Sequence, residues 1–104
     1  MADAKLSWQH DNGKLAFDGE LTRATVPAAW EQRDSWQSEA GDQLQVDLSE
    51  VEHVDSAGVA MLLQLKKYLM QKDCELTILN PSQQFKAIVE VSGGTDLLEL
   101  ASEE

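Results

Sequence analysis

The chain has 104 residues, of which 42% are hydrophobic and 26% charged, and this composition suits one globular domain spanning residues 1–104. Eight basic and nineteen acidic residues give a net charge of −11, which argues against nucleic acid and anionic lipid as direct partners because both are bound through Lys and Arg. A single cysteine excludes an internal disulfide and a multi-cysteine metal cluster. The sequence has neither a signal-peptide pattern nor an apolar run of membrane-spanning length, so we expect a cytoplasmic protein.

The first twenty residues predict an antiparallel β-hairpin. Two short segments of alternating or aromatic character, Leu6–Gln9 and Leu15–Phe17, are separated by Asp11-Asn12-Gly13. Asn-Gly between two such segments favours a tight hairpin turn, because both residues tolerate a positive φ.

The next segment predicts one amphipathic helix that ends near Ser38. Pro27 suits its first turn, and Thr25 is a candidate N-cap. At 100° per residue, an arc of about 120° contains most of the apolar and aromatic side chains together with one arginine: Val26, Ala29, Trp30, Arg33 and Trp36. Because so thin an apolar face cannot bury two indole rings deeply, we expect Trp30 to face outward.

A strand and the longest helical pattern of the chain come next. Leu44, Val46 and Leu48 alternate with polar residues and predict a strand over 44–48, followed by a polar connector over 49–53. A helix is then predicted over 56–72. One of its sides is expected to be apolar and to comprise Val59, Leu62, Leu63, Leu69 and Met70.

The last third predicts a strand over 76–79, a helix over 82–91 capped by Ser82 and stopped by Gly93-Gly94, and a short turn or helix over 95–100 before a solvated tail. The inward side of the helix over 82–91 is expected to comprise Phe85, Ile88 and Val89. Strands that alternate with helices imply parallel pairing behind the antiparallel hairpin. The predicted fold is therefore a single α/β domain with a mixed sheet and helices packed against it.

Residue types used in catalysis occur close together at His53, Asp55 and Ser56. In an extended segment His53 and Asp55 point to the same side, roughly 6.6 Å apart, and Ser56 points to the other. This arrangement does not supply the hydrogen-bonded series that a nucleophile, a base and an orienting acid require. The sequence has no glycine-rich nucleotide loop, and its two histidines stand at unrelated positions, so we predict no enzymatic activity, no cofactor and no metal. We expect Cys74 to act as a small apolar side chain that fills space in the core and not as a reactive thiol.

The most informative stretch runs from Val54 to Leu63, at the start of the longest predicted helix. Asp55 or Ser56 can accept hydrogen bonds from the first turn, and the small Ala57 and Gly58 allow close approach of another backbone. This composition supports two interpretations. Either the segment is only a well-capped helix start, or it displays a hydroxyl for docking and phosphorylation.

Asp55-Ser56-Ala57-Gly58-Val59, placed between a strand with its polar connector and an apolar helix, resembles the signature of the STAS-domain family of anti-sigma-factor antagonists. The predicted element order is also similar to that of the family over nearly the whole chain. The resemblance implies that Ser56 lies on a partner-binding surface. In the sigma-factor branch of the family, it further implies phosphorylation of Ser56 by a partner kinase.

Other features look more like the MlaB branch, the small STAS subunit of a Gram-negative phospholipid-trafficking ABC transporter. The matching residues are Leu6-Ser7-Trp8, Gly19-Glu20-Leu21, and Pro27, Trp30 and Glu31. The motif hydroxyl of that branch is often a threonine followed by Gly-Gly, whereas this chain has Ser56-Ala57-Gly58. This branch implies a non-catalytic subunit that binds the cytoplasmic ATPase subunit, supports outer-membrane lipid asymmetry, and is peripheral to the inner membrane through its partner.

The expected binding surface joins the start of the longest helix to an outward-facing Trp30, because tryptophan often dominates binding energy. Its predicted residues are Trp30, Asp55, Ser56, Ala57, Gly58 and Val59. The strong negative charge is either ordinary solvation or a feature that steers the domain onto a basic partner surface. The expected partner is the ABC transporter ATPase subunit. The alternative is an anti-sigma-factor kinase, with the chain as an antagonist regulated by phosphorylation of Ser56.

Overall fold

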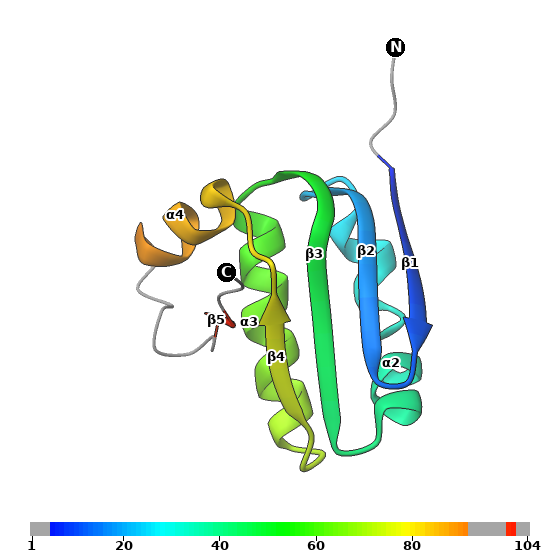
Figure 1. Cartoon of the computed structure of the whole chain (residues 1–104). Helices are drawn as coiled ribbons and strands as arrows, with labels where there is room; N and C mark the ends of the chain where they lie inside the picture. Colours follow the sequence, from blue (N-terminus) through cyan, green and yellow to red (C-terminus); the bar gives the residue numbers. More distant parts are fainter. Residues whose placement is uncertain (1–4, 92–99, 102–104) are drawn as a thin grey trace.

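The structure, a computed structural model, describes residues 5–91 and 100–101 and places them in two layers. A β-sheet forms one layer, and helices cover one of its faces (Figure 1). The described strands are β1 (Leu6–Asp11), β2 (Lys14–Leu21), β3 (Gln43–Val54), β4 (Glu75–Leu79) and β5 (Leu100–Ala101). The described helices are α1 (Val26–Trp30), α2 (Arg33–Ala40), α3 (Ser56–Met70) and α4 (Gln83–Val91).

The N-terminal hairpin is confirmed. Strands β1 and β2 pair antiparallel, from Leu6 opposite Gly19 to Asp11 opposite Lys14. The turn between them has positive φ at both central residues, 53° at Asn12 and 80° at Gly13. Positive φ at both positions matches the type I′ turn, whose twist suits the flanking strands.

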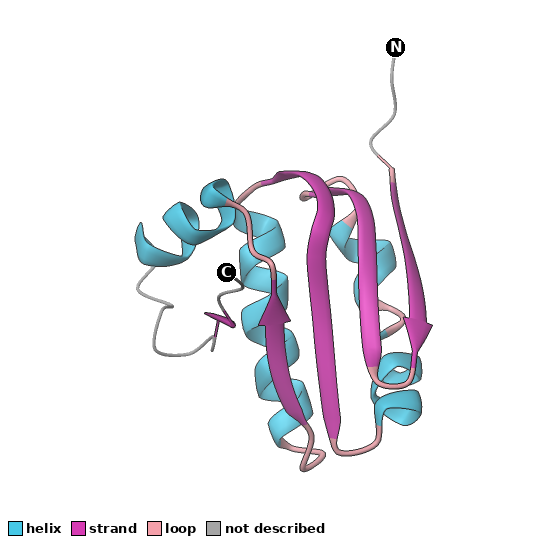
Figure 2. Cartoon of the chain, in the orientation of Figure 1, coloured by secondary structure: helices cyan, strands magenta, loops and turns pink. Residues whose placement is uncertain are grey.

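The remaining strands pair in parallel, in the order β1-β2-β3-β4-β5 (Figure 2). The predicted mixed sheet with helices packed against it is therefore confirmed. Strand β3 is longer than predicted, because residues 49–53 continue the strand instead of forming a connector. Their backbone pairs with the second half of β2, for example Glu50 with Asp18 and Val54 with Leu21. The hydrogen-bonded ladder forms although these side chains are mostly polar and exposed.

The prediction of one helix over 26–38 is wrong, because α1 ends at Trp30 and α2 begins at Arg33. The Arg33 guanidinium donates to the carbonyl oxygen of Trp30 at 3.0 Å and satisfies one acceptor at the end of α1. Thr25 stands at the N-cap position, but its side chain does not cap α1. Its hydroxyl instead donates to the carbonyl oxygen of Glu20 at 2.8 Å, which ties the β2–α1 loop to the strand.

Breaking the helix allows an aromatic cluster to form under the hairpin. Trp36 is 2% exposed, and its ring packs edge-on at 5.5 Å from Phe17 and 5.7 Å from Trp8, measured between ring centroids. Edge-to-face pairs of this kind add to the energy of burial. Trp30 lies outside this cluster and is half-buried against the core, so the expectation that it faces outward is met only in part.

The apolar side of α3 differs in part from the prediction. Leu62, Leu65 and Leu69 form its central buried stripe at spacings of three and four residues. Met70 was predicted to face inward but is 62% exposed, because it lies about 100° around the helix from Leu69. Leu63 is half-buried and Met61 is buried, so the buried side is rotated relative to the predicted one.

The C-terminal elements agree with the prediction in part. The Ser82 hydroxyl accepts a hydrogen bond from the amide of Phe85 at 3.0 Å, as expected of a helix cap. On the inward side of α4, Phe85 and Val89 are buried and Ile88 is half-buried. Leu100 lies in β5, paired with β4, and not in a turn or helix; a two-residue strand leaves no periodicity to detect. The predictions for residues 92–99 and 102–104 fall outside the described residues.

Cys74 is 2% exposed, and burial, together with the charges of Asp42 and Glu75, raises the pKa of its thiol. A buried thiol that stays protonated acts as a small apolar side chain, as predicted.

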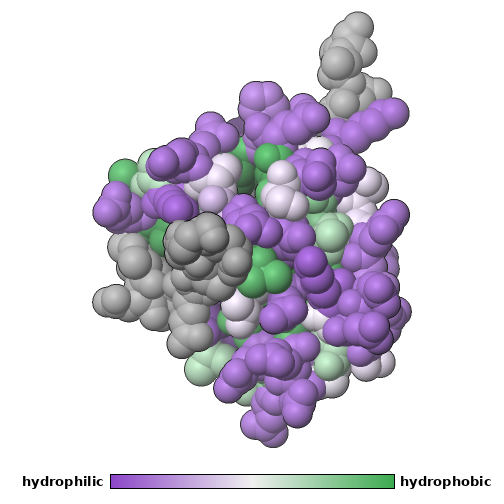
Figure 3. Space-filling view, in the orientation of Figure 1, coloured by the Kyte–Doolittle hydropathy of each residue, from purple (hydrophilic) through white to green (hydrophobic). Residues whose placement is uncertain are grey.

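The face of the sheet that the helices leave uncovered is largely hydrophilic (Figure 3). At its centre the carboxylate of Asp47 lies 3.4 Å from the ammonium of Lys14 and accepts from the Asn80 amide at 3.1 Å and from the Ser49 backbone at 2.9 Å. Burial alone would raise the pKa of Asp47, but these hydrogen bonds outweigh it, so the pKa lies below its usual value of 3.8.

Replacing Asp47 by asparagine is expected to flatten the acid limb of the stability curve. A lowered pKa in the folded state stabilises the fold above the unfolded-state pKa, and this contribution is lost as the pH falls through the folded-state value. Urea midpoints measured from pH 7 down to about pH 2 would show the difference between wild type and Asp47→Asn shrinking below about pH 4. A difference that stays constant across this range would contradict the assignment.

Candidate partner-binding site

The candidate site lies where β3 ends and α3 begins. Asp55 continues the extended backbone with φ −121° and ψ −174°, and its amide donates to the carbonyl oxygen of Leu21, the last residue of β2, at 3.3 Å. Residues that follow the ends of parallel strands meet at one edge of the sheet. The β2–α1 loop and the start of α3 are therefore neighbours.

The Asp55 carboxylate holds this junction together. One oxygen accepts from the amides of Ala57 at 2.9 Å and Gly58 at 3.2 Å, and the other accepts from the amide of Arg23 at 3.2 Å. The first two bonds cap α3, and the third attaches the β2–α1 loop to it. Asp55, and not Ser56, is thus the capping residue.

Ser56 is the first residue of α3, and its side chain is exposed. Within residues 5–91 and 100–101, its hydroxyl makes no hydrogen bond to the protein. Asp55 and Ala57 beside it are half-buried. The structure therefore assigns the capping role to Asp55 and leaves the Ser56 side chain exposed to solvent.

Gly58 and Val59, also predicted for the site, are buried. A methyl group added at Gly58 would fall inside van der Waals contact with the carbonyl oxygen of Leu21 and 2.9 Å from the Cγ2 atom of Val54. Gly58 therefore lets α3 approach the backbone of β2, and Val59 packs in the core. Both residues hold the start of α3 against the sheet, and neither forms part of the accessible surface of the site.

The prediction that Trp30 and Ser56 form one patch is not supported by the structure. Trp30 packs edge-on against Tyr68, with ring centroids 6.4 Å apart, and the Arg33 guanidinium lies 4.6 Å from the Trp30 ring. Twelve residues of helix separate Tyr68 from Ser56, which is about 18 Å along α3. Trp30 therefore packs beside the C-terminal half of α3, whereas Ser56 lies at the N-terminal end of this helix.

The surface around Trp30 contains residues that the sequence interpretation missed. The Tyr68 hydroxyl donates to the Asp34 carboxylate, and this hydrogen bond raises the pKa of Tyr68. The side chain of Lys72 lies 5.6 Å from the Tyr68 ring centroid. No local pattern pointed to this group, because its members come from three helices, α1, α2 and α3, and from the turn after α3, which pack together only in the folded chain.

Arg23 was missed as well, although a signal for it existed. Once β2 and β3 are taken as parallel neighbours, the residues that follow Leu21 and Val54 must lie at the same edge. The loop that contains Arg23 therefore belongs beside the start of α3.

Replacing Asp55 by alanine is expected to lower the free energy of unfolding by about 1–2 kcal/mol, because it removes the helix cap and the attachment of the loop. Asp55→Asn keeps an acceptor for the cap and should lose less than half of that amount. Urea unfolding of the two variants measures the difference. Equal losses for Asn and Ala would show that the carboxylate does not act through these hydrogen bonds.

Two further observations concern other kinds of site. Among residues 5–91 and 100–101, no three or more His, Cys, Asp and Glu side chains are grouped so that they could hold a metal ion. In the same residues, none of the helices combines the length and the apolar character that crossing a membrane requires.

Comparisons with known proteins agree on the family. The family model described as "Mlab, STAS domain" matches residues 4–99. The anti-sigma-B factor antagonist of Listeria monocytogenes is 30% identical over 94 residues, which cover 90% of this chain and 82% of that protein. Its counterpart in Staphylococcus aureus is 32% identical over 85 residues, covering 82% and 79% of the two chains.

Solved structures show the same fold. The anti-sigma factor antagonist SpoIIAA in its unphosphorylated form aligns over 95% of this chain and 90% of its own, with a TM-score of 0.72 at 18% identity. An anti-sigma factor antagonist from Mycobacterium paratuberculosis aligns over 95% and 86%, with a TM-score of 0.77 at 19% identity. The match of the family model to almost the whole chain, together with relatives at 30% identity, shows that this protein belongs to the STAS-domain family.

Proposed function

We propose that this chain is a non-catalytic module that binds a protein partner through the surface formed by Asp55, Ser56 and Ala57, and that it acts as an anti-sigma-factor antagonist regulated by phosphorylation of Ser56. The observation that carries this proposal is the exposed Ser56 hydroxyl at a helix start that Asp55 already caps. A serine needed for capping would be turned toward the backbone. Ser56 is instead open to the active site of a kinase.

The position of Asp55 also determines what a phosphate at Ser56 would do. Phosphorylation adds about −1.5 to −2 charges at neutral pH. Free amides at a helix start normally attract a phosphate, but the Asp55 carboxylate already accepts from Ala57 and Gly58. The added charge would stay at the surface beside Asp55, where it would repel an acidic partner surface. Against an apolar partner surface it would have to lose its hydration, so in either case the partner is released.

The relatives support this candidate. Those at 30–32% identity are named anti-sigma-B factor antagonists. The fold neighbour SpoIIAA of Bacillus is known in both an unphosphorylated and a phosphorylated form.

A second candidate is the STAS subunit of a phospholipid-trafficking ABC transporter, bound to its cytoplasmic ATPase and peripheral to the inner membrane through it. The observation that favours it is the family model, whose description contains "Mlab". The MlaB-like residues Leu6-Ser7-Trp8 and Pro27, Trp30 and Glu31 agree with it. In this candidate Ser56 would be a constitutive contact without a phosphate.

Intact-mass spectrometry distinguishes the two candidates. The purified chain and a Ser56→Ala control are incubated with ATP and an extract of the source organism, then captured with their bound proteins. A single phosphate on wild type only, with a kinase among the bound proteins, supports antagonism. No phosphate and a co-purifying ABC ATPase support the transporter subunit. A phosphate that persists in Ser56→Ala, or capture of neither class, would refute the role of Ser56.

A further inference from the structure

An open groove runs beside the N-terminal half of β1. It has a volume of about 770 Å³. Its lining includes Leu6 and Trp8 of β1, and Ala24 and Ala28, which lie before and within α1. Leu6 and Trp8 are only partly buried against the core, so they leave apolar surface to the groove. The small side chains of Ala24 and Ala28 leave space for an extended segment.

The polar part of the lining is predominantly acidic. Asp18, Glu20 and Glu52 supply three carboxylates, and Lys5 is the one basic residue of the lining. None of these three acids has a basic group within ion-pair distance in the described part of the chain. Asp18 also lies opposite Glu50 in the pairing of β2 with β3, and like charges in such positions destabilise a sheet. A cation bound here would relieve that repulsion.

We infer that this groove binds an extended, cationic segment of a protein, in which Lys or Arg side chains meet the three carboxylates and small apolar side chains face Leu6 and Trp8. Complementary charge identifies the occupant, because a chain with a net charge of −11 repels a second copy of itself and anionic ligands. An extended segment fits a groove beside an edge strand better than a helix does.

The groove adjoins the surface around Ser56. Thr25 lines the groove, and its hydroxyl bonds to Glu20. Two residues earlier in the same loop, the amide of Arg23 bonds to Asp55. One partner can therefore contact both places. The inference relies on the proposed function only for assigning the segment to that partner.

The test uses the complete ¹⁵N-labelled chain and two synthetic peptides of about eight residues, one alternating arginine with alanine and one alternating glutamate with alanine. The arginine peptide is expected to shift the amide resonances of residues 5–8, 18–20 and 24–28, and the glutamate peptide none of them. Asp18→Asn/Glu20→Gln/Glu52→Gln should weaken binding by about tenfold or more. Ala28→Gln narrows the groove without a change of charge and should weaken binding by about fivefold.

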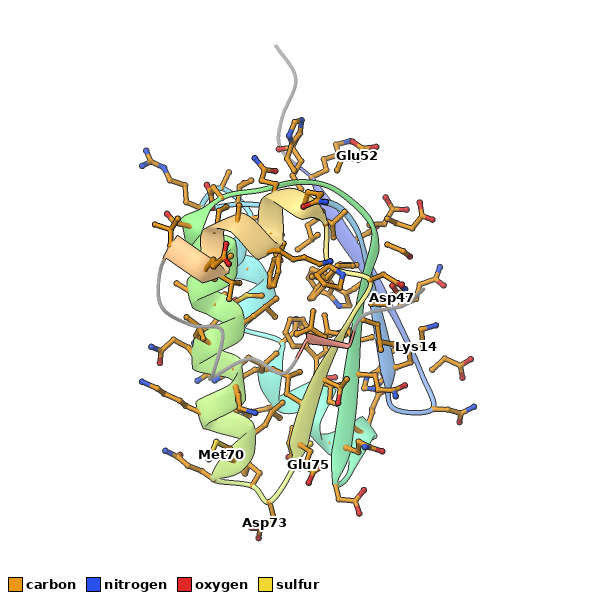
Figure 4. All side chains as sticks on the ribbon, turned by 60° about the vertical axis from the view of Figure 1, so that its left-hand side comes forward. Lys14, Asp47, Glu52, Met70, Asp73 and Glu75 are labelled. Carbon is orange, nitrogen blue, oxygen red and sulfur yellow. The ribbon has the colours of Figure 1, made fainter. Side chains whose placement is uncertain are left out.

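The matched control is Asp42→Asn/Asp73→Asn/Glu75→Gln, which removes the same charge at the opposite end of the domain. Figure 4 shows Glu52 at one end and Asp73 and Glu75 at the other. This control should change the affinity by less than about twofold. Equal weakening by both triple variants, shifts spread over the whole surface, or a dimer that Ala28→Gln abolishes would overturn the inference. Because the titration involves neither Ser56 nor a partner protein, its outcome is independent of the phosphorylation experiment.

Discussion

Replacing Gly58 by alanine is expected to lower the free energy of unfolding by about 3 kcal/mol, a large part of the stability of a domain of this size. The new methyl group would overlap the carbonyl oxygen of Leu21 and crowd Val54. Neither neighbour can easily move, because Leu21 and Val54 are paired in the sheet and the Leu21 carbonyl also accepts from Asp55. At an uncrowded helix position, replacing glycine by alanine would raise the free energy of unfolding by up to about 1 kcal/mol. A decrease instead of an increase would therefore show that the methyl group meets the backbone of β2.

Urea unfolding measures this change as a shift of the midpoint at constant slope. Ser56→Ala, two residues earlier on the exposed side of the same helical turn, is the control and should stay within about 0.5 kcal/mol of wild type. A Gly58→Ala protein as stable as wild type would mean that α3 does not approach β2 as closely as the structure shows.

Replacing Ser56 by glutamate is expected to weaken the binding of the partner by about 100-fold or more, because it places an unpaired charge at the centre of the proposed contact. The fold should be nearly unaffected, since the Ser56 side chain is exposed and an acidic residue is favourable at a helix start. The affinity is measured by surface plasmon resonance against the partner identified by capture, at a fixed salt concentration.

Two controls separate charge at the site from charge in general. Ser56→Ala removes the hydroxyl without adding charge and should cost less than about tenfold. Ser38→Glu adds the same charge at another exposed helical serine and should have little effect. If Ser38→Glu weakens binding as much as Ser56→Glu does, overall repulsion is responsible, and the proposed surface is wrong.

Much of the site was predictable, because its signal is local. The run from Asp55 to Gly58 combines a capping carboxylate, a hydroxyl and two small residues at the point where a strand pattern gives way to a helical one. What could not be read was which residue caps and which is displayed, since either side chain can reach the first-turn amides. The accessible part of the site also depends on burial, which removed Gly58 and Val59 from the surface.

The expected position of Trp30 depended on a helix that the structure divides. Periodicity places Trp30 on the edge of an apolar face only if residues 26–38 form one continuous helix. The helix is interrupted at residues 31–32. Trp36 is buried in the core, and Trp30 packs on Tyr68. Trp36 packs against Trp8 and Phe17 of the hairpin, and contacts of this kind lie outside any pattern within residues 26–38.

By itself, the amino-acid sequence determined the hairpin, the alternation of strands and helices, the α/β class and the Asp55–Gly58 motif at the start of a helix. These features follow from turn chemistry and from side-chain periodicity within one segment. Only the tertiary structure decided the full length of β3, the break between α1 and α2, the packing of Trp30 on Tyr68, and the acidic groove beside β1. Each of these depends on backbone pairing or side-chain packing between segments far apart in the chain, and no periodicity within a segment records such contacts.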